Sequence, residues 1–356
     1  MRPALAVIAF TAVASIGIMA PRVDSLGQYY PLNTDADLAK WTAHDPAVTG
    51  AVDIHSHGDP DSNYERNFVS ASNPTGRTGQ FDIIEEAKIA KASGMRAIVH
   101  KSKRIESSTL AYLARKAVPG IEIFGAISMD RPFGMNPFAV QVMANVEGGW
   151  GRVIFMVAED ANVGDRDPVK TVYVSKNGVL LPETKAVIEV IAKTKTRGSN
   201  GTLVMATGHN SPEDSLLMVR EAARVGVKNM VLTHPGANWT LAQLQEGVSL
   251  GAYVEITILS AFTPKENLNG VDPVAHKRGL ELIRTLGAEH IIISSDMGRM
   301  HSTDTVGNPT SPQALAQTAK LLRADGITEK QINMMFKDNP SRLMGLPVTT
   351  TAEATP

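Results

Sequence analysis

The stretch Ala51-Val52-Asp53-Ile54-His55-Ser56-His57-Gly58-Asp59 decides between two common folds that alternate strands with helices. Its first part is a short apolar run, which indicates a buried β-strand. The turn that follows is rich in histidine, whereas the first turn of a dinucleotide-binding sheet carries a G-x-G-x-x-G pattern. An open doubly wound sheet is therefore the weaker alternative, and the remaining strands should continue into a barrel.

Seven further apolar runs follow this strand, and helical patterns separate them. Their hydrophobicity is continuous, as in Ile291-Ile292-Ile293, which is typical of strands buried on both faces of a parallel sheet. The eight predicted strands are Ala51–His57, Arg96–Lys101, Ile121–Ser128, Arg152–Ala158, Thr202–Thr207, Asn229–His234, Ala252–Ile258 and His290–Ser294. Eight strand–helix units in series predict an α/β protein that forms a single-domain (β/α)8 TIM barrel.

Turns and helix starts punctuate the chain between these strands. Ser211-Pro212 and Val271-Asp272-Pro273 are typical of helix starts, because a polar N-cap followed by proline suits the first turn. Two long connections follow the first and fourth strands, at residues 58–80 and 160–182, and the second contains Asn177-Gly178, which predicts a tight hairpin. We expect both to shape a substrate site at the carboxyl ends of the strands, although plain surface loops are the alternative.

Composition excludes several classes of function. The chain has 356 residues, of which 43% are hydrophobic, enough for a large core and too many for a disordered chain. It has no cysteine, so disulfides, thiolate nucleophiles, cysteine-ligated zinc and iron–sulfur clusters are excluded. Its formal net charge of −1 leaves no excess of positive charge of the kind that nucleic-acid binding requires. The expected partner is a small-molecule substrate, and a homo-oligomer is left open.

The N-terminal segment differs from the rest of the chain. Met1-Arg2-Pro3 precedes an apolar run from Ala4 to Ala20, which is short for a spanning helix and typical of a secretory signal. We expect residues 1–24 to be a signal peptide that makes the protein periplasmic or secreted, with an uncleaved membrane anchor as the alternative. The segments that follow are a lead-in at 25–50, the barrel at 51–346 and a polar tail at 347–356.

Four histidines and one aspartate stand where predicted strands end. Because all these ends open on one face of a barrel, the side chains should gather there. They are His55 and His57 on the first strand, His209 after the fifth, His234 at the end of the sixth and Asp296 after the eighth. Imidazole with carboxylate suits zinc, manganese, nickel or iron. Each residue alone has a structural explanation, but their shared face predicts a metal site.

Strand parity refines this expectation. His55 and His57 are two residues apart and should point to the same side of the first strand. Asp53 has the same parity, so Val52 and Ile54 are expected to face the helices. Barrel closure would then bring the eighth strand, and the aspartate that follows it, beside the two histidines.

Several motifs extend beyond the single residues. They are Asp53-Ile54-His55-Ser56-His57, His209, Thr233-His234-Pro235, Ser295-Asp296 and Asn339-Pro340-Ser341-Arg342-Leu343-Met344-Gly345-Leu346. With these motifs the sequence resembles the amidohydrolase superfamily of metal-dependent hydrolases over roughly residues 50–346. Three stretches look closer to an uncharacterised bacterial branch of it: Gly94–Val99, Val118–Gly125 and Ala206–Glu213.

The resemblance implies a role for each candidate ligand. His55, His57 and Asp296 would hold a first metal, whereas His209 and His234 would hold a second one. Alternatively, His234 would polarise the substrate beside a single metal. The implied cofactor is a divalent metal, one or two per chain, with zinc as the first choice and manganese, nickel or iron as alternatives.

A bridging ligand and a substrate clamp are less settled. In superfamily members with two metals, a carboxylated lysine or a glutamate from the fourth strand bridges them. This fourth strand has no lysine; Glu159 is the positional candidate, and Lys101 on the second strand is a less usual one. Lys101, Arg131 and Arg299 also follow strands and are candidates for binding an anionic group of the substrate, with ordinary surface cations as the alternative.

The implied reaction is hydrolysis of an amide, lactone, ester or phosphoester of a small molecule. A bound divalent metal lowers the pKa of water from 15.7 to roughly 7. Asp296 would accept the proton and pass it to the leaving group, while His234 or a second metal would stabilise the oxyanion. The alternative is a mononuclear metal-dependent decarboxylase or hydratase of the same superfamily, and a non-catalytic solute-binding barrel is less favoured.

Overall fold

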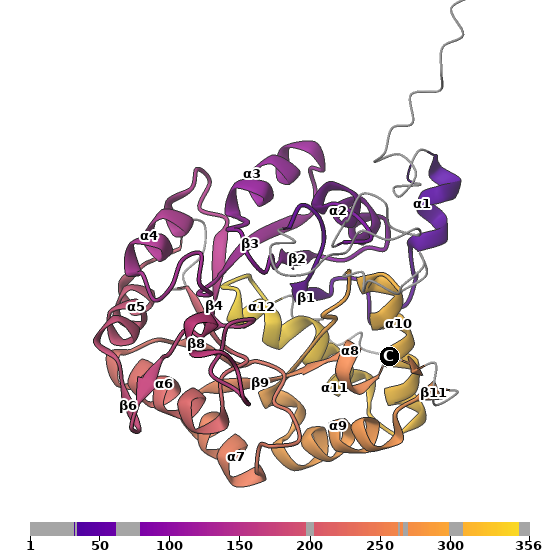
Figure 1. The fold of residues 1–356 in the computed structure, drawn as a ribbon. Helices are drawn as coiled ribbons and strands as arrows, with labels where there is room; N and C mark the ends of the chain where they lie inside the picture. The colour runs from indigo at the N-terminus through magenta and orange to yellow at the C-terminus, as the bar shows by residue number, and fades with distance from the viewer. Residues whose placement is uncertain are drawn as a thin grey trace, which may run out of the picture.

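The structure is a computed structural model that describes residue 32 and residues 34–61, 79–196, 203–262, 264–265, 270–298 and 309–348. Eight parallel strands form one sheet, ordered as they follow in the chain (Figure 1). The strands are β1 (Val52–Ser56), β2 (Ala97–His100), β3 (Glu122–Ser128), β4 (Gly151–Val157), β7 (Val204–Gly208), β8 (Asn229–Leu232), β9 (Ala252–Thr257) and β12 (Ile291–Ser294). Each predicted run overlaps one strand, and the predicted barrel is confirmed.

The barrel is closed by the chain that follows β12 and not by a regular ladder. The Asp296 N–H donates to the His55 carbonyl at 2.7 Å, and the His57 N–H donates to the Met297 carbonyl at 2.7 Å. We call this contact among His55, His57, Asp296 and Met297 the closure seam. It brings the first and last strands of the barrel together at their carboxyl ends.

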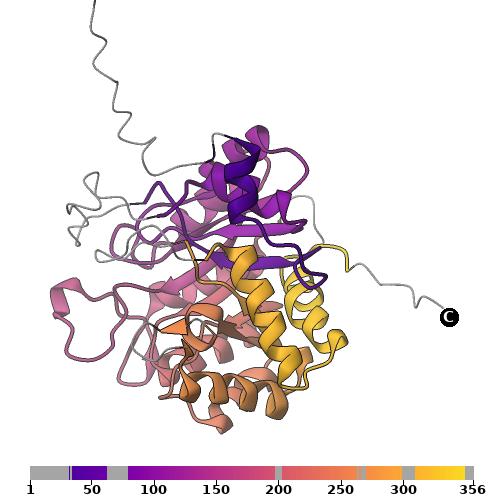
Figure 2. The same cartoon turned by 90° about the vertical axis from the view of Figure 1, so that its right-hand side faces the viewer.

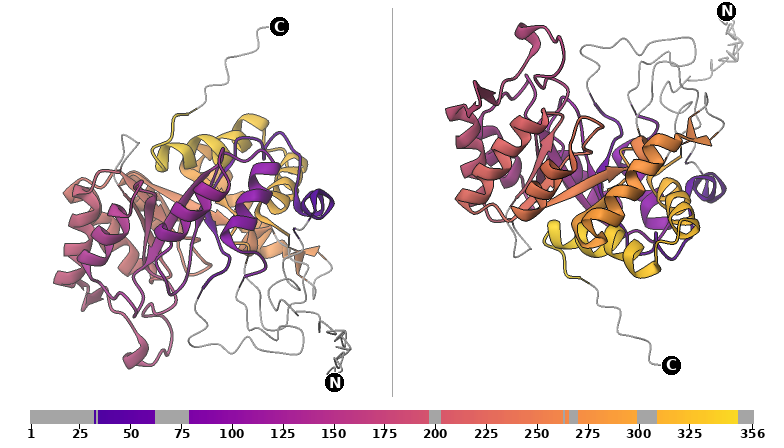
Figure 3. Two further views of the ribbon diagram at one scale, coloured as in Figure 1. Left: turned by 90° about the horizontal axis from the view of Figure 1, so that it is seen from above. Right: turned by 90° about the horizontal axis from the view of Figure 1, so that it is seen from below.

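Helices alternate with the strands and surround the barrel (Figures 1 and 3). They are α2 (Ile83–Ala92), α3 (Ser108–Ala117), α4 (Pro137–Asn145), α5 (Pro182–Lys193), α6 (Pro212–Val225), α7 (Leu241–Ser249), α9 (Pro273–Leu286) and α10 (Ser311–Ala324). A continuous C-terminal helical segment follows: α11 (Glu329–Asn333), the π-helical η4 (Met334–Asp338) and α12 (Asn339–Leu343). Figure 2 shows these C-terminal helices beside β1.

Short elements complete the described chain. Helix α1 (Asp35–Trp41) and the single-turn α8 (Ile258–Ala261) were not expected from the sequence. The others are the 3₁₀ turns η1 (Pro168–Lys170) and η3 (Ala288–His290) and the hairpin strands β5 (Ser175–Lys176), β6 (Val179–Leu180), β10 (Pro264–Lys265) and β11 (Gly270–Val271). The long segment between β4 and α5 projects from the barrel and carries the β5–β6 hairpin (Figure 3).

Local chemistry explains these boundaries. The Ser211 and Asp272 side chains accept hydrogen bonds from the first turns of α6 and α9, as the N-cap prediction requires. Helix α6 ends at Gly226, whose φ of 90° is open to glycine. At the tip of the β5–β6 hairpin, Asn177 and Gly178 have φ values of 52° and 75°, which matches the predicted tight turn.

The barrel interior is packed mostly by small and β-branched side chains. Val52 and Ile54 belong to this inner cluster, together with Phe155 of β4, and Leu343 of α12 completes it. The parity prediction that placed Val52 and Ile54 against the helices is therefore wrong. The pairing register of β1 with β2 shifts between Asp53 and Ser56, and such an irregularity re-aims the side chains beyond it.

Within the described part of the chain, no helix is long and apolar enough to cross a membrane. The predicted signal segment, residues 1–24, lies outside the described residues, as do residues 62–78 of the first long connection and 349–356 of the polar tail.

Candidate metal centre

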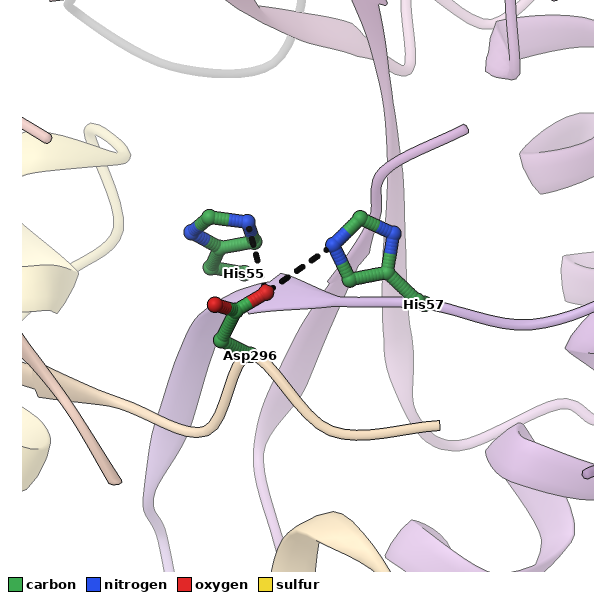
Figure 4. Close-up of side chains that lie close together, drawn as sticks. All are labelled: His55, His57 and Asp296. Atoms are coloured by element: carbon green, nitrogen blue, oxygen red, sulfur yellow. Dashed lines mark hydrogen bonds and ion pairs between the residues drawn. The ribbon is translucent and has the colours of Figure 1, made fainter. Parts of the chain in front are cut away.

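His55, His57 and Asp296 meet at the closure seam, at the mouth of the barrel (Figure 4). The Asp296 Oδ1 atom lies 3.0 Å from His57 Nε2 and 3.3 Å from His55 Nε2. One ligand atom from each residue lies within 4.8 Å of the other two. Asp296 has a φ of 53°, a left-handed conformation that aspartate tolerates better than most residues. The structure therefore brings together the three ligands predicted for a first metal.

The electrostatics of this group suit a divalent cation. Burial alone would raise the pKa of Asp296, but the charge of His55 and a hydrogen bond from His57 lower that pKa well below its usual value. Burial lowers the pKa of His57 well below its usual value. The group thus offers a carboxylate and a neutral imidazole, the forms that bind metals. His57 Nδ1, the ring nitrogen that does not face Asp296, is buried without a hydrogen-bond partner among the described residues.

Glu255 of β9 is a buried acid beside His55 that the sequence motifs did not indicate. Its Oε1 atom lies 3.0 Å from His55 Nδ1 and accepts a hydrogen bond from the Ser294 hydroxyl at 2.6 Å. Its Oε2 atom accepts one from the His234 N–H at 3.2 Å. A carboxylate on Nδ1 holds the His55 ring so that Nε2 faces Asp296, which is the usual support of a metal-binding histidine.

The signal for Glu255 was present in the sequence. It is the single charged residue in the apolar run Ala252–Ile258, and a buried carboxylate of this kind needs partners. In the structure Glu255 is 1% exposed, and burial raises its pKa. The residues around Glu255 are apolar, so the run as a whole indicates an ordinary buried strand.

His209 and His234 form a second pair beside the first group. Their Nε2 atoms are 3.1 Å apart, and the His234 ring stacks on His55 with centroids 5.8 Å apart. Burial, followed by the charge of Lys101, lowers the pKa of His209 well below its usual value. In the described ranges, only His55, His57 and Asp296 form a cluster of three metal-binding side chains.

Lys101 places a cation inside this constellation. The residue follows β2 and is 2% exposed. Its Nζ atom lies 3.2 Å from His55 Nε2 and 4.5 Å from the centroid of the Phe155 ring. The ammonium group and a metal ion would therefore compete for the same nitrogen of His55.

The other predicted site residues either pair with residues outside the His55, His57 and Asp296 group or are not among the described residues. Glu159, the candidate bridging ligand, pairs with Lys103 through a 2.9 Å contact between Oε1 and Nζ. Arg131 contacts Asp160, with Nε 3.4 Å from Oδ1. Arg299 lies outside the described residues. The roles predicted for Glu159, Arg131 and Arg299 stay predictions.

A cavity of about 750 Å³ adjoins the constellation on the β8–β9 side. His234 and Glu255 form its inner wall, and Trp239, Ile256 and Leu282 are among the apolar side chains that line it. A volume of this size is typical of small-molecule sites, which are mostly apolar with a few polar groups. The barrel mouth thus combines a candidate metal group with space for a substrate.

The sequence matches one family model and no curated protein. The model of the family of unknown function DUF6282 matches residues 50–255. This range runs from the strand with His55 and His57 to Glu255 and includes His209 and His234, but it stops before Asp296. Among the curated proteins, none matches.

Solved structures share the barrel. A mutant of a PTE-like lactonase from Deinococcus radiodurans is 18% identical, with a TM-score of 0.54 over 85% of this chain and 98% of that chain. An organophosphorus hydrolase from the same organism is 18% identical, with a TM-score of 0.53 over 86% of this chain and 97% of that chain. At these identities the likeness shows the fold, which is the fold expected for the amidohydrolase superfamily.

Proposed function

The chain belongs to the family of unknown function DUF6282, and we propose that it is a metal-dependent hydrolase of a small molecule. The observation that carries the proposal is the convergence of His55, His57 and Asp296 within 4.8 Å at the barrel mouth. A PTE-like lactonase and an organophosphorus hydrolase share the fold, so lactones and phosphoesters are the first substrates to test, followed by esters and amides.

The residues of the site divide the work of hydrolysis. His55, His57 and Asp296 would hold the metal, with zinc as the first choice for imidazole and carboxylate ligands. A bound ion of this kind supplies Lewis acidity and lowers the pKa of water to about 7. Asp296 holds the released proton on Oδ2, since Oδ1 faces the two imidazoles, and returns it to the leaving group. His234 Nε2 donates a hydrogen bond to the substrate oxygen that gains charge.

The surroundings hold these groups in place. Glu255 is a positioning residue, because it orients the His55 ring and binds the main chain of His234. The apolar cavity on the β8–β9 side would take the body of the substrate and keep bulk water from the reacting groups.

A mononuclear decarboxylase or hydratase is the second candidate. It is supported by the single three-residue cluster of the described chain, with His209 and His234 forming only a pair beside it. The ammonium group of Lys101 beside His55 weakens the attraction of this group of residues for cations in general, which disfavours two metal ions there together. A metal count of one would favour this candidate, and a count of two would favour a binuclear hydrolase.

The test measures metal content and hydrolysis on the same preparations. Protein purified without chelator is expected to carry one or two equivalents of metal, and His55→Ala/His57→Ala is expected to lose metal from the first site. The rate at which the double variant hydrolyses a lactone or phosphotriester should be at least a hundredfold below that of the wild type. His44→Ala removes an exposed histidine of the lead-in segment and should change neither quantity. Failure of the wild type to take up zinc or manganese would overturn the proposal.

We also propose that residues 1–24 direct export to the periplasm or the medium. The proposal is supported by the apolar run from Ala4 to Ala20 behind a single arginine. N-terminal sequencing of the mature protein separates a cleaved signal from a retained anchor.

A further inference from the structure

Three arginines converge on one buried carboxylate at the barrel mouth. Asp160 follows β4 and is 1% exposed. Its Oδ2 atom lies 2.5 Å from Arg104 Nη1, and its Oδ1 atom lies 3.4 Å from Arg131 Nε and 3.8 Å from Arg166 Nη1. The Arg131 N–H also donates to Oδ2 at 2.9 Å. We call these four residues the Asp160 cluster.

The cluster belongs to the same face as the candidate metal centre. Its residues follow β2, β3 and β4, so they lie at the carboxyl ends of the strands. Glu159, the neighbour of Asp160 in the chain, acts electrostatically on His209. The charges of Lys101 and Arg104 both attract the buried carboxyl group of Asp130, and this group accepts a hydrogen bond from the Asp160 main-chain N–H. The cluster and the metal centre therefore share one electrostatic environment.

The three guanidinium groups do not share Asp160 equally. The side chain of Arg104 is 9% exposed and has the short contact, which fits an internal ion pair. The side chains of Arg131 and Arg166 are 24% and 34% exposed. At 3.8 Å, Arg166 is attracted to Asp160 without a hydrogen bond to it. The guanidinium of Arg166 can therefore form hydrogen bonds to another oxyanion besides the Asp160 carboxylate.

We propose that Arg166 and Arg131 bind an oxyanion group of the substrate, either a carboxylate or a phosphate. A guanidinium matches the two oxygens of such a group and forms strong charge-assisted hydrogen bonds to them. Asp160 holds the arginines at the mouth before the substrate arrives. Arg166 comes from the long segment after β4, which the sequence already marked as a substrate wall.

This inference rests on the proposed function and narrows its substrate class. In strand order, β3 and β4 are separated from β8 and β9, which border the apolar cavity. The oxyanion and the apolar body would therefore approach the metal centre from different sides. The inferred substrate carries its hydrolysable bond between an apolar part and an anionic part.

The test measures binding and not turnover. Isothermal titration calorimetry measures the binding of inorganic phosphate and, in a separate titration, of glutarate to the full protein. Each titration is done on the protein as purified and again after a chelator has removed bound metal. At least one probe is expected to bind in both states. Arg131→Gln/Arg166→Gln should weaken that binding at least about tenfold, and Arg166→Gln alone should weaken it several-fold. The probe that binds identifies phosphate or carboxylate as the recognised group.

Matched controls separate the possible results. Arg220→Gln removes an exposed arginine of α6 that pairs with Glu246 and should leave probe binding unchanged. Thermal midpoints of all variants establish that they fold. Binding that survives chelation but depends on the arginines supports the inference even if no hydrolysis is found, in which case only the proposed function fails. No binding by the wild type, or binding that depends on the metal and ignores the arginines, would overturn the inference.

Discussion

Two buried residues act in opposite directions on a cation at His55. Glu255 contacts His55 Nδ1 at 3.0 Å and turns Nε2 toward Asp296, whereas Lys101 brings an ammonium group to 3.2 Å from that Nε2. A carboxylate behind a ligand strengthens metal binding, and a positive charge beside it weakens binding. The two residues are therefore a sensitive test of whether His55 is a metal ligand.

We predict that substitutions at these positions shift zinc affinity with opposite signs. Glu255→Gln should weaken binding by about 10- to 100-fold, because it loses the charge that supports His55. Lys101→Met should tighten binding by roughly tenfold, because it removes the competing charge. Competition with a chromophoric chelator measures both constants without any substrate. Loss of zinc from Lys101→Met would show instead that this lysine is itself a ligand.

The sequence could predict the candidate ligands because each stands where a strand ends. His55, His57 and Asp296 needed only strand order and closure of the barrel to be placed together. Glu255 and the partners of Asp160 could not be placed in the same way. Their contacts depend on which side chains face each other across loops and neighbouring strands, and a single sequence does not give that geometry.

Among the elements, β1 departs from regular strand alternation. Simple alternation along β1 would leave Asp53 and His55 on one side, yet the structure turns His55 inward and leaves Asp53 bonded to the start of α10. The Asp53 carboxylate accepts hydrogen bonds from the Ser311 hydroxyl at 2.5 Å and from the Ser295 N–H at 3.0 Å. The existence of the strand could be predicted from its apolar pattern. Its register shift could not, since the shift depends on the partner strands.

This arrangement predicts a stability effect at Asp53. Asp53→Ala would leave the buried Ser295 N–H without its acceptor and loosen the closure seam, at a cost of about 2–4 kcal/mol in unfolding free energy. Asp272→Ala, which removes an N-cap on the outer helix α9, should cost only about 1 kcal/mol. Denaturant unfolding of both variants checks the order. Equal losses would mean that Asp53 does not hold the seam.

At the scale of the whole molecule, an ion pair joins the lead-in segment to helix α10, near the C-terminal end of the barrel. Arg323 of α10 donates two hydrogen bonds of 2.8 Å to Asp45, and these lower the pKa of Asp45. A lowered pKa stabilises the fold only while the carboxyl group is ionised. The contribution is therefore present above the usual pKa of 3.8 and is lost as the pH falls through the lower folded value.

We predict that Arg323→Gln lowers the unfolding free energy at pH 7 by about 0.5–1 kcal/mol. The difference from the wild type should shrink as the pH falls below 3.8, because Asp45 and Glu329, whose pKa values Arg323 lowers, then take up protons and the ion pairs are lost. Denaturant midpoints at pH 7, 5 and 3 measure the trend. A difference that is the same at all three values would assign the effect to packing of the arginine stem.

The closure seam also has a consequence for how the protein is made. His57 and Asp296 are 239 positions apart, so the two halves of the candidate metal group leave the ribosome at very different times. A nascent or truncated chain carries the histidines without the aspartate and offers an incomplete set of ligands. Metal retention would therefore distinguish complete chains from truncated ones.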